Sequence, residues 1–293
     1  MSDVAAAAIA MTIGVLGTST IHLSKGMMRL GIDRLRAEGG DRRRAKAIYV
    51  VGVLMNFTNP LWVILANRFA PTVYYTSMYG LGLLPLLLFS RTMLAERLHR
   101  SQYAGILVIV VGTLLVGAGN MTGGKPSLYG ADRTLLVSVA VGWLVLAPLV
   151  SILVRRRSIG LQELFFGIFA GGLAALEAVV KGVAQAGAVE NTFLPQTAST
   201  WWLFGASFLG AAGAFGMIQW SYLRSCRASM MGSIYDVAYV AVPLLLTTAI
   251  VEGATLGVWR VVGIAVLGAG VVAVGRAPGR RGDQGSFRLQ SYS

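Results

Sequence analysis

Four ionisable side chains interrupt segments of the chain that are otherwise apolar: Lys25, Glu177, Lys181 and Asp236. A charged group inside a bilayer-spanning segment is costly, and such groups usually belong to ion pathways, proton relays or ligand sites. A carboxylate can bind a cation or exchange a proton, and an ammonium group can pair with a carboxylate. These four residues are therefore the first candidates for chemistry.

Asp236 is the clearest of the four. It lies about eight residues into an apolar run, roughly 12 Å from the start of a helix that rises about 1.5 Å per residue. Tyr235 precedes it, and Tyr239 follows three residues later on the same helical face. A carboxylate at this depth could exchange a proton, anchor a substrate amine or bind a cation, and it is the best candidate for a metal ligand. The alternative is a buried carboxyl group that bonds to a tyrosine and only orients two helices.

The other ionisable residues lie closer to helix ends. His22 and Lys25 belong to the stretch "GTSTIHLSKGMMRL" and lean the same way. We interpret this stretch as the place where one half of the chain faces an aqueous pathway, although Lys25 could instead reach the lipid headgroups. His22 is either a titrating gate or a neutral ring bonded to a backbone carbonyl. Glu177 and Lys181 are four residues apart, so they can form an ion pair on one helical face.

Uncharged polar residues extend the predicted pathway. Asn56 and Asn59 share a helical face, and Pro60 removes the helical hydrogen bond to the Asn56 carbonyl. That carbonyl could bind a cation if it faces a water-filled cavity, or it could mark only a kink. The remaining members of this group are Tyr74, Tyr75, Tyr79, Gln219 and Tyr222.

Composition identifies the setting of these residues. The chain has 293 residues, of which 55% are hydrophobic and 13% are charged, whereas soluble domains carry about a quarter charged residues. An integral membrane protein is the simplest interpretation, with the lipid bilayer as its partner. The net charge of +13 would suggest nucleic acid in a soluble protein, but here we assign it to loops and expect no nucleic acid. Cys226 is the single cysteine, so no intrachain disulfide or cysteine-based metal cluster can form, and we expect no cofactor.

Nine apolar runs approach the length of about 20 residues that a membrane-spanning helix needs. The fold class that we predict is therefore all-α, a polytopic bundle of nine transmembrane helices. The N-terminal segment lacks a basic region before its apolar run, so we expect a retained first helix rather than a cleaved signal peptide. The runs are approximately 4–28, 47–67, 71–90, 101–119, 133–154, 160–187, 201–223, 228–250 and 258–275, with a polar loop at 188–200.

The basic residues test this count. If nine helices alternate in direction, nineteen of the 25 lysine and arginine residues fall on one side and four on the other. Lysine and arginine concentrate in cytoplasmic loops. We therefore expect a multi-pass protein of the plasma (inner) membrane with its N-terminus outside and its C-terminus in the cytoplasm.

An internal repeat relates the two halves of the chain. Residues of one type recur 156 positions apart, in the pairs Lys25 and Lys181, Arg68 and Arg224, Tyr79 and Tyr235, and Glu96 and Glu252. Helices one to four then match helices six to nine, and a shift of five crossings gives the two copies opposite orientations. Inverted repeats are typical of secondary transporters, whose substrate site lies near the membrane midplane between the halves. The predicted parts are a first repeat at 1–131, a linking helix at 132–157, an inverted second repeat at 158–275 and a disordered cytoplasmic tail at 276–293.

Several motifs resemble the drug/metabolite transporter (DMT) superfamily, and in particular its NIPA-type magnesium transporter and EamA-like branch. The resemblance covers about residues 7–276. It is carried by "GTSTIHLSKGMMRLG" (17–31), "FAP" (69–71), "AERL" (95–98), "QWSYLRSCRASM" (219–230), "SIYDVAYV" (233–240) and "TTAIVE" (247–252). It implies transport of a small solute by alternating access, with magnesium or another divalent cation as one cargo.

The chain departs from that branch in helix two. An acidic residue is expected in the middle of this helix, but "LMNFTNPLW" (54–62) contains no carboxylate. Magnesium is usually bound through one or two carboxylates, so the resemblance implies the transporter class more firmly than the ion. We keep open an exporter of small organic metabolites or drugs and a non-transporting accessory subunit. We do not expect an enzyme, and a homodimer is compatible with the sequence.

Overall fold

The computed structural model describes residues 2–37, 40–95, 99–122, 127–186 and 192–275. These residues are all-helical, and among them nine helical segments are long and apolar enough to cross a membrane. For the described part of the chain, the predicted all-α class is therefore confirmed, and so is the predicted number of helices long and apolar enough to cross a membrane. The predicted tail at 276–293 and Glu96 of the repeat lie outside the described residues.

The nine crossings follow one another along the chain, and two of them are divided into shorter helices. They are α1 (Asp3–Arg36), α2 with α3 (Arg42–Asn56 and Asn59–Asn67), α4 with η1 and α5 (Thr72–Thr76, Tyr79–Gly82 and Leu83–Thr92), α6 (Arg100–Thr122), α7 (Arg133–Val154), α8 (Ile159–Gln185), α9 (Ala198–Leu223), α10 (Ala228–Ile250) and α11 (Gly257–Gly275).

Two boundaries differ from the sequence prediction. The first helix continues to Arg36, so it has 34 residues rather than ending near residue 28. His22 and Lys25 therefore lie in its interior instead of near its end. The loop expected at 188–200 ends earlier than predicted, because α9 begins at Ala198. Thr197 caps α9 in a reciprocal capping box with Thr200, which satisfies backbone N–H groups that the first turn leaves free.

The helix of the second crossing is interrupted just before Pro60. The α2 helix ends at Asn56, and α3 begins at Asn59 with Pro60 in its first turn. Proline lacks the N–H that a continuous helix would use, but it is well tolerated in a first turn. The Thr58 hydroxyl donates to the Met55 carbonyl over 2.6 Å inside the break. Asn56 and Asn59, expected on one face of one helix, thus belong to two different helices.

The third crossing is also discontinuous. A short helix, α4, is followed by the 3₁₀ turn η1 and then by α5. Two glycines in η1 allow close packing here: a Cβ atom at Gly80 would collide with Thr113 of α6, and one at Gly82 would collide with Thr18 and His22 of α1. The irregular backbone of this crossing therefore lies directly against α1 and α6.

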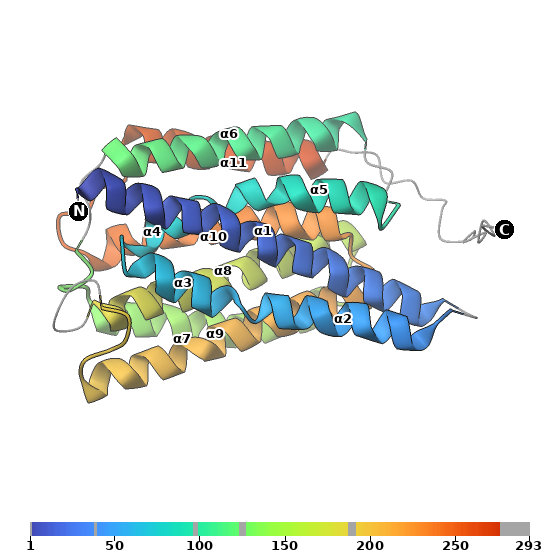
Figure 1. Ribbon diagram of the computed structural model, residues 1–293, viewed down its shortest axis with the longest axis horizontal. Helices are drawn as coiled ribbons and strands as arrows, with labels where there is room; N and C mark the ends of the chain where they lie inside the picture. Colours follow the sequence, from blue (N-terminus) through green and yellow to red (C-terminus); the bar gives the residue numbers. More distant parts are fainter. Residues whose placement is uncertain (1, 38–39, 96–98, 123–126, 187–191, 276–293) are drawn as a thin grey trace.

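Helices distant in the sequence pack side by side. The pair α6 and α11 makes the most extensive contact (Figure 1). Glycines at Gly112 and Gly263 allow it, because a Cβ at either would lie 2.9 to 3.0 Å from the carbonyl of the other. Small residues of this kind let membrane helices approach closely. The α8 helix packs on both α9 and α10, and α1 packs on α2.

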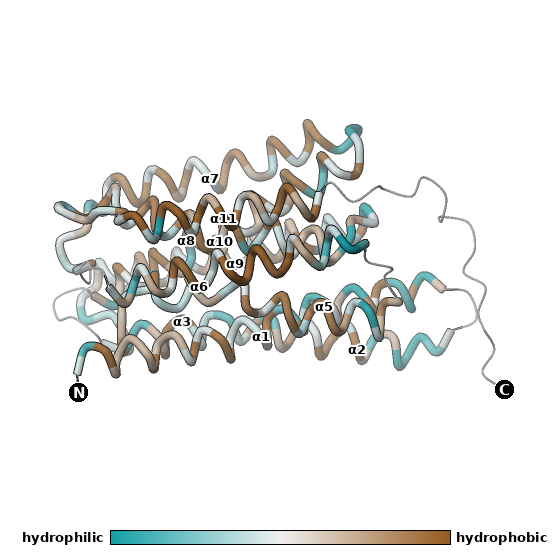
Figure 2. The backbone as a smooth tube through the Cα atoms, turned by 90° about the horizontal axis from the view of Figure 1, so that it is seen from above, coloured by the Kyte–Doolittle hydropathy of each residue, from teal (hydrophilic) through white to brown (hydrophobic). Residues whose placement is uncertain are grey.

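The helices divide into an interior group and a peripheral group with more exposed apolar surface. The most apolar windows of α8, of the third crossing and of α10 are 78%, 67% and 61% buried, whereas those of the second crossing and α7 are 11% and 17% buried. Figure 2 shows hydrophobic residues along the lengths of the helices and hydrophilic ones mainly at their ends. The C-terminal ends of α1 and α5 and the N-terminal ends of α2 and α6 share one end of the bundle (Figure 1). The interior is thus built from α8, α10 and the third crossing.

Candidate functional site

A buried histidine and a buried carboxylate join the first helix to α10. His22 Nε2 lies 2.7 Å from Oδ1 and 2.8 Å from Oδ2 of Asp236. Both side chains have 0% exposure, and 214 residues separate them in the chain. Asp236 is therefore paired with a histidine, a partner that the sequence analysis did not suggest.

The hydrogen-bond partners of His22 determine how many protons the His22–Asp236 pair carries. Nδ1 lies 2.7 Å from the backbone carbonyl of Thr18, which can only accept, so Nδ1 carries a hydrogen. Nε2 contacts two carboxyl oxygens, and that contact is attractive only if another proton lies between the ring and Asp236. The pair is either an imidazolium with a carboxylate or a neutral ring with a carboxylic acid. In both descriptions it holds one exchangeable proton and is neutral overall.

Local sequence positions the His22 ring. Thr18, His22 and Lys25 recur at spacings of four and three, so they line one face of α1. The Thr18 hydroxyl donates to the Tyr79 carbonyl over 2.8 Å and lies 3.1 Å from His22 Nδ1. Gly82 provides the space that the ring occupies. The discontinuity in the third crossing thus supplies both a carbonyl and a glycine to this face.

Lys25 is buried next to the pair without a hydrogen-bond acceptor. Its side chain is 2% exposed, and its Nζ has no hydrogen-bond partner among the described residues. The Nζ lies 3.4 Å from the centroid of the Tyr235 ring and 5.3 Å from that of Tyr79, which stabilises the cation through ring faces. The charge of Asp236 also acts on it. The alternative in which Lys25 reaches the headgroups is wrong, because the extended α1 keeps it in the interior.

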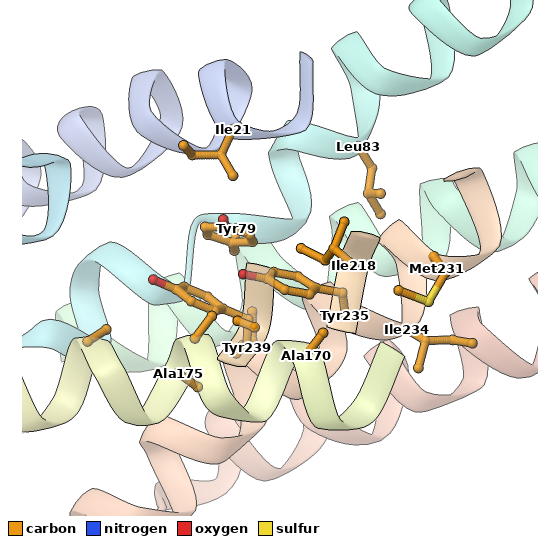
Figure 3. Close-up of a cluster of buried hydrophobic side chains, with 14 of the residues drawn as sticks. Ile21, Tyr79, Leu83, Ala170, Ala175, Ile218, Met231, Ile234, Tyr235 and Tyr239 are labelled. Atoms are coloured by element: carbon orange, nitrogen blue, oxygen red, sulfur yellow. The ribbon is translucent and has the colours of Figure 1, made fainter. Parts of the chain in front are cut away.

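Two tyrosine rings, those of Tyr79 and Tyr235, face Lys25, and Tyr239 packs against both of them. The ring centroids of Tyr79 and Tyr239 are 3.9 Å apart, and those of Tyr235 and Tyr239 are 5.8 Å apart and stacked. Figure 3 shows the three rings gathered between the third crossing, α8 and α10. Tyr75 continues the cluster and donates to Asn59 Oδ1 over 3.1 Å.

Two of these hydroxyls have unused hydrogen-bonding capacity. Tyr79 lies near the Tyr235 side chain, and Tyr239 lies near Asn59. Neither the Tyr79 nor the Tyr239 hydroxyl makes a hydrogen bond of ordinary geometry within the described residues. Buried polar atoms normally have partners, so the unpartnered Lys25 Nζ beside the Tyr79 and Tyr235 rings marks a place where a polar ligand can be bound.

The predicted ion pair on α8 is confirmed, but it lies elsewhere. Glu177 and Lys181 form a fully buried salt bridge. Lys181 Nζ lies 4.1 Å from the Phe208 ring centroid, and Glu177 packs near Gly210, so the pair faces α9. Glu177 and Lys181 thus form a second polar centre, separate from the His22–Asp236 pair.

Asn56 and Gln219 lie against α1, closer to its C-terminal end, whereas the Tyr74 hydroxyl donates to the Asn120 carbonyl of α6 over 2.7 Å. Asn56 Oδ1 lies 3.5 Å from the Ser24 hydroxyl, at the limit of a hydrogen bond. Gln219 accepts from the Tyr49 hydroxyl over 2.9 Å and approaches the Met28 sulfur at 3.1 Å. Their hydrogen bonds therefore run to α1 and α2 and not to His22 or Asp236.

Tyr222 is buried beside this group. Its backbone carbonyl accepts from Arg29 over 3.3 Å, and its side chain lies close enough to Tyr235 to act on it electrostatically. Tyr222 therefore connects the C-terminal half of α1 with the tyrosine cluster.

Sequence reasoning did not identify two polar contacts. Glu163 is fully buried near the start of α8. Its carboxylate accepts from Nε of Arg227 over 3.0 Å and from Nη2 of the same arginine over 2.9 Å. Such two-point contacts are geometrically specific. Arg260 of α11 donates to Asn120 Oδ1 of α6 over 2.8 Å. The sequence separations of 64 and 140 residues gave no signal that these partners meet.

The described residues contain no group of three or more histidine, cysteine, aspartate or glutamate side chains that could hold a metal ion. Asp236, the best metal candidate from sequence, already shares a proton with His22 and lies beside a lysine. Comparison with known proteins adds no further guide, because no protein-family model, curated protein or solved structure matches this chain.

Proposed function

We propose that this protein is a secondary transporter of the drug/metabolite type, which moves a small solute across the plasma membrane by alternating access and couples it to a proton. The observation that carries the proposal is the buried contact between His22 and Asp236. It holds one exchangeable proton at a point where the first crossing meets the eighth. A rocking motion between two halves of the chain would expose such a proton to each side in turn.

The broken third crossing supports a transport role. Substrate sites in secondary transporters are typically formed by discontinuous helices, because irregular backbone frees carbonyl groups at membrane depth. Here the irregular segment at η1 contributes its Tyr79 carbonyl to Thr18, next to His22. Packing also follows the order expected of a repeat: α1 packs on α2 as α8 packs on α9, and α6 pairs with α11.

The charge distribution supports the proposed orientation. Arg29, Arg34, Arg36 and the basic run 42–46 lie around the end of α1 and the start of α2, which share one end of the bundle (Figure 1). Arginine and lysine concentrate on the cytoplasmic side of membrane proteins. We therefore assign that end to the cytoplasm and the start of α1 to the outside.

The site favours an organic solute as cargo over magnesium. Mg²⁺ binds through oxygen ligands, usually including carboxylates that carry no competing proton. Asp236 shares a proton with His22, and the nearby Lys25 would repel a divalent cation. Magnesium remains the alternative cargo because the sequence motifs resemble those of magnesium transporters. A non-transporting subunit is less well supported, because buried ionisable groups destabilise a scaffold that has no use for them.

Reconstituted protein can test the proposal directly. Proteoliposomes containing a pH-sensitive dye would receive an amine, a carboxylate, a neutral solute or MgCl₂ under an inward proton gradient. We expect solute-dependent proton entry in wild type and its loss in Asp236→Asn, which keeps the shape of the side chain but not its charge. Glu252→Gln, at an exposed loop position, is the matched control and should behave as wild type. Full proton entry in Asp236→Asn would contradict the proposed role of this carboxylate.

A further inference from the structure

The geometry around Lys25 identifies the class of solute. We propose that the Lys25 ammonium binds the carboxylate of a small organic monoanion, which the protein carries together with one proton. This inference rests on the proposed transport function and deepens it. It starts from one fact: Lys25 is a buried cation whose Nζ makes no hydrogen bond within the described residues.

A comparison within the chain shows that Lys25 is unusual. Lys181 is equally buried, but it forms a salt bridge with Glu177 on its own helix. An ammonium group has three hydrogens to donate, and a buried charge is strongly unfavourable unless it is paired. The face of the Tyr235 ring, 3.4 Å from Nζ, stabilises the charge but accepts no conventional hydrogen bond. An anionic oxygen is the partner that this site lacks.

The surroundings restrict the anion. One lysine provides a single compact charge, whereas phosphate groups are usually held by arginine forks or several basic groups. A singly charged carboxylate fits one ammonium group. The faces of the Tyr235 and Tyr79 rings, 3.4 and 5.3 Å from Nζ, provide an aromatic surface beside the ammonium group. The solute class is therefore a small monocarboxylate with an apolar or aromatic body.

Charge balance then links the solute to the proton. With its shared proton, the His22–Asp236 pair is neutral overall, so Asp236 offsets the charge of Lys25 only in part and the ammonium group attracts a carboxylate. When the proton leaves, Asp236 becomes a free carboxylate that competes for Lys25, and the solute is released. Loading and release thus each involve one proton and one carboxylate, and transport is electroneutral.

The other ionisable groups near the pair do not change this balance. Neutral tyrosines face it from the third crossing and α10, and the Glu177–Lys181 pair of α8 is already compensated and faces α9. Besides His22, Asp236 acts electrostatically on Lys25, Tyr79 and Tyr235, and these two tyrosines also interact with Tyr75, Tyr222 and Tyr239.

Thermal unfolding of the purified full chain tests the solute class without a transport assay. The probes are acetate, benzoate and phenylacetate, each compared with its amide, together with benzylamine and MgCl₂. A ligand that binds only the folded state raises the unfolding temperature. We expect at least one carboxylate to do so, more strongly at lower pH, while its amide, the amine and magnesium do not.

Substitution of the lysine gives the second readout. Lys25→Met should weaken carboxylate binding by about tenfold or more, as expected for loss of a charge-assisted contact. Lys46→Met makes the same change at an exposed position and should bind as wild type. If Lys25→Met does not fold, Lys25→Gln replaces it, and the comparison of each acid with its amide on wild type decides the matter.

The possible results separate this inference from the proposed function. Stabilisation by no carboxylate, or equal stabilisation of Lys25→Met and wild type, would overturn the carboxylate site, whereas proton entry with an amine or magnesium would leave transport intact. Lys25-dependent carboxylate binding without proton entry for any solute would instead support the site and refute transport.

Discussion

The Thr18 hydroxyl donates a hydrogen bond to the Tyr79 carbonyl over 2.8 Å, and this bond connects the first crossing to the irregular turn in the third. The backbone carbonyl of the same threonine accepts from His22 Nδ1 over 2.7 Å. One residue therefore sets both the position of the turn and the hydrogen that His22 must carry. The arrangement couples the broken helix to the proton-bearing pair.

Thr18→Val tests this connection. The substitution keeps the shape of the side chain but leaves the Tyr79 carbonyl without its donor, which should destabilise the fold by about 1 to 3 kcal/mol. It should also reduce proton entry in proteoliposomes, because the turn loses its bond to α1 and the His22 ring loses its 3.1 Å contact with the Thr18 hydroxyl. Thr20→Val is the control: its hydroxyl bonds only to the Leu16 carbonyl on the exposed side of α1. Equal behaviour of the two variants would show that the Thr18 hydroxyl has no special role.

Gly82→Ala tests the space that the His22 ring needs. A Cβ atom at this position collides with the ring and with the Thr18 hydroxyl, so one of them must move. Overpacking of this kind typically destabilises by about 1 to 3 kcal/mol, and displacement of the ring should lower proton entry. Gly216→Ala on α9 meets open space and should be neutral or slightly stabilising. Thermal unfolding and proton entry should be measured on both variants. If Gly82→Ala behaves like Gly216→Ala in both measurements, the packing argument is refuted.

Cys226 lies between α9 and α10, fully buried beside Glu163. Burial, with a smaller effect of the Glu163 charge, raises the pKa of the Cys226 thiol to about 12. Because the thiolate is the reactive form, we expect very slow maleimide labelling of the folded protein at pH 7 to 9 and rapid labelling after unfolding.

An exposed thiol provides the control for this labelling experiment. Thr92→Cys introduces a cysteine at an exposed position near the end of α5, and this cysteine should label quickly in the folded protein. The labelling rate of this introduced thiol should rise with pH, because an exposed thiol ionises near its ordinary pKa. Fast labelling of Cys226 in the folded wild type would contradict its burial.

The number and positions of the long apolar helices could be predicted from sequence because they depend on local properties. Each apolar run has the length of a crossing, and the nine predicted runs correspond to the nine helical segments of the described residues. The break before Pro60 also has a local cause, since proline cannot continue a helix. The extension of α1 to Arg36 was missed, because a helix can leave the bilayer and continue through polar residues without any change in its backbone bonding.

The site could be predicted only in part. Asp236, Lys25 and His22 were selected because they are ionisable residues in apolar surroundings, and they prove to lie together. The pairing of His22 with Asp236 could not be read from the sequence, because 214 residues separate them and only tertiary packing brings them into contact. Asn56 and Gln219 show the converse: polar residues in apolar runs can bond to other neighbours.

The Glu177–Lys181 salt bridge should matter for stability more than for transport. Its two groups are fully buried and face α9, so Lys181→Met leaves Glu177 as an uncompensated buried charge. Removing one partner of a buried pair typically destabilises by about 3 to 5 kcal/mol. The double variant Glu177→Gln with Lys181→Met removes both charges and should recover most of that loss in thermal unfolding, with proton entry near the wild-type rate. If the double variant is stable but inactive, the Glu177–Lys181 pair takes part in transport, and the prediction that it serves only stability is wrong.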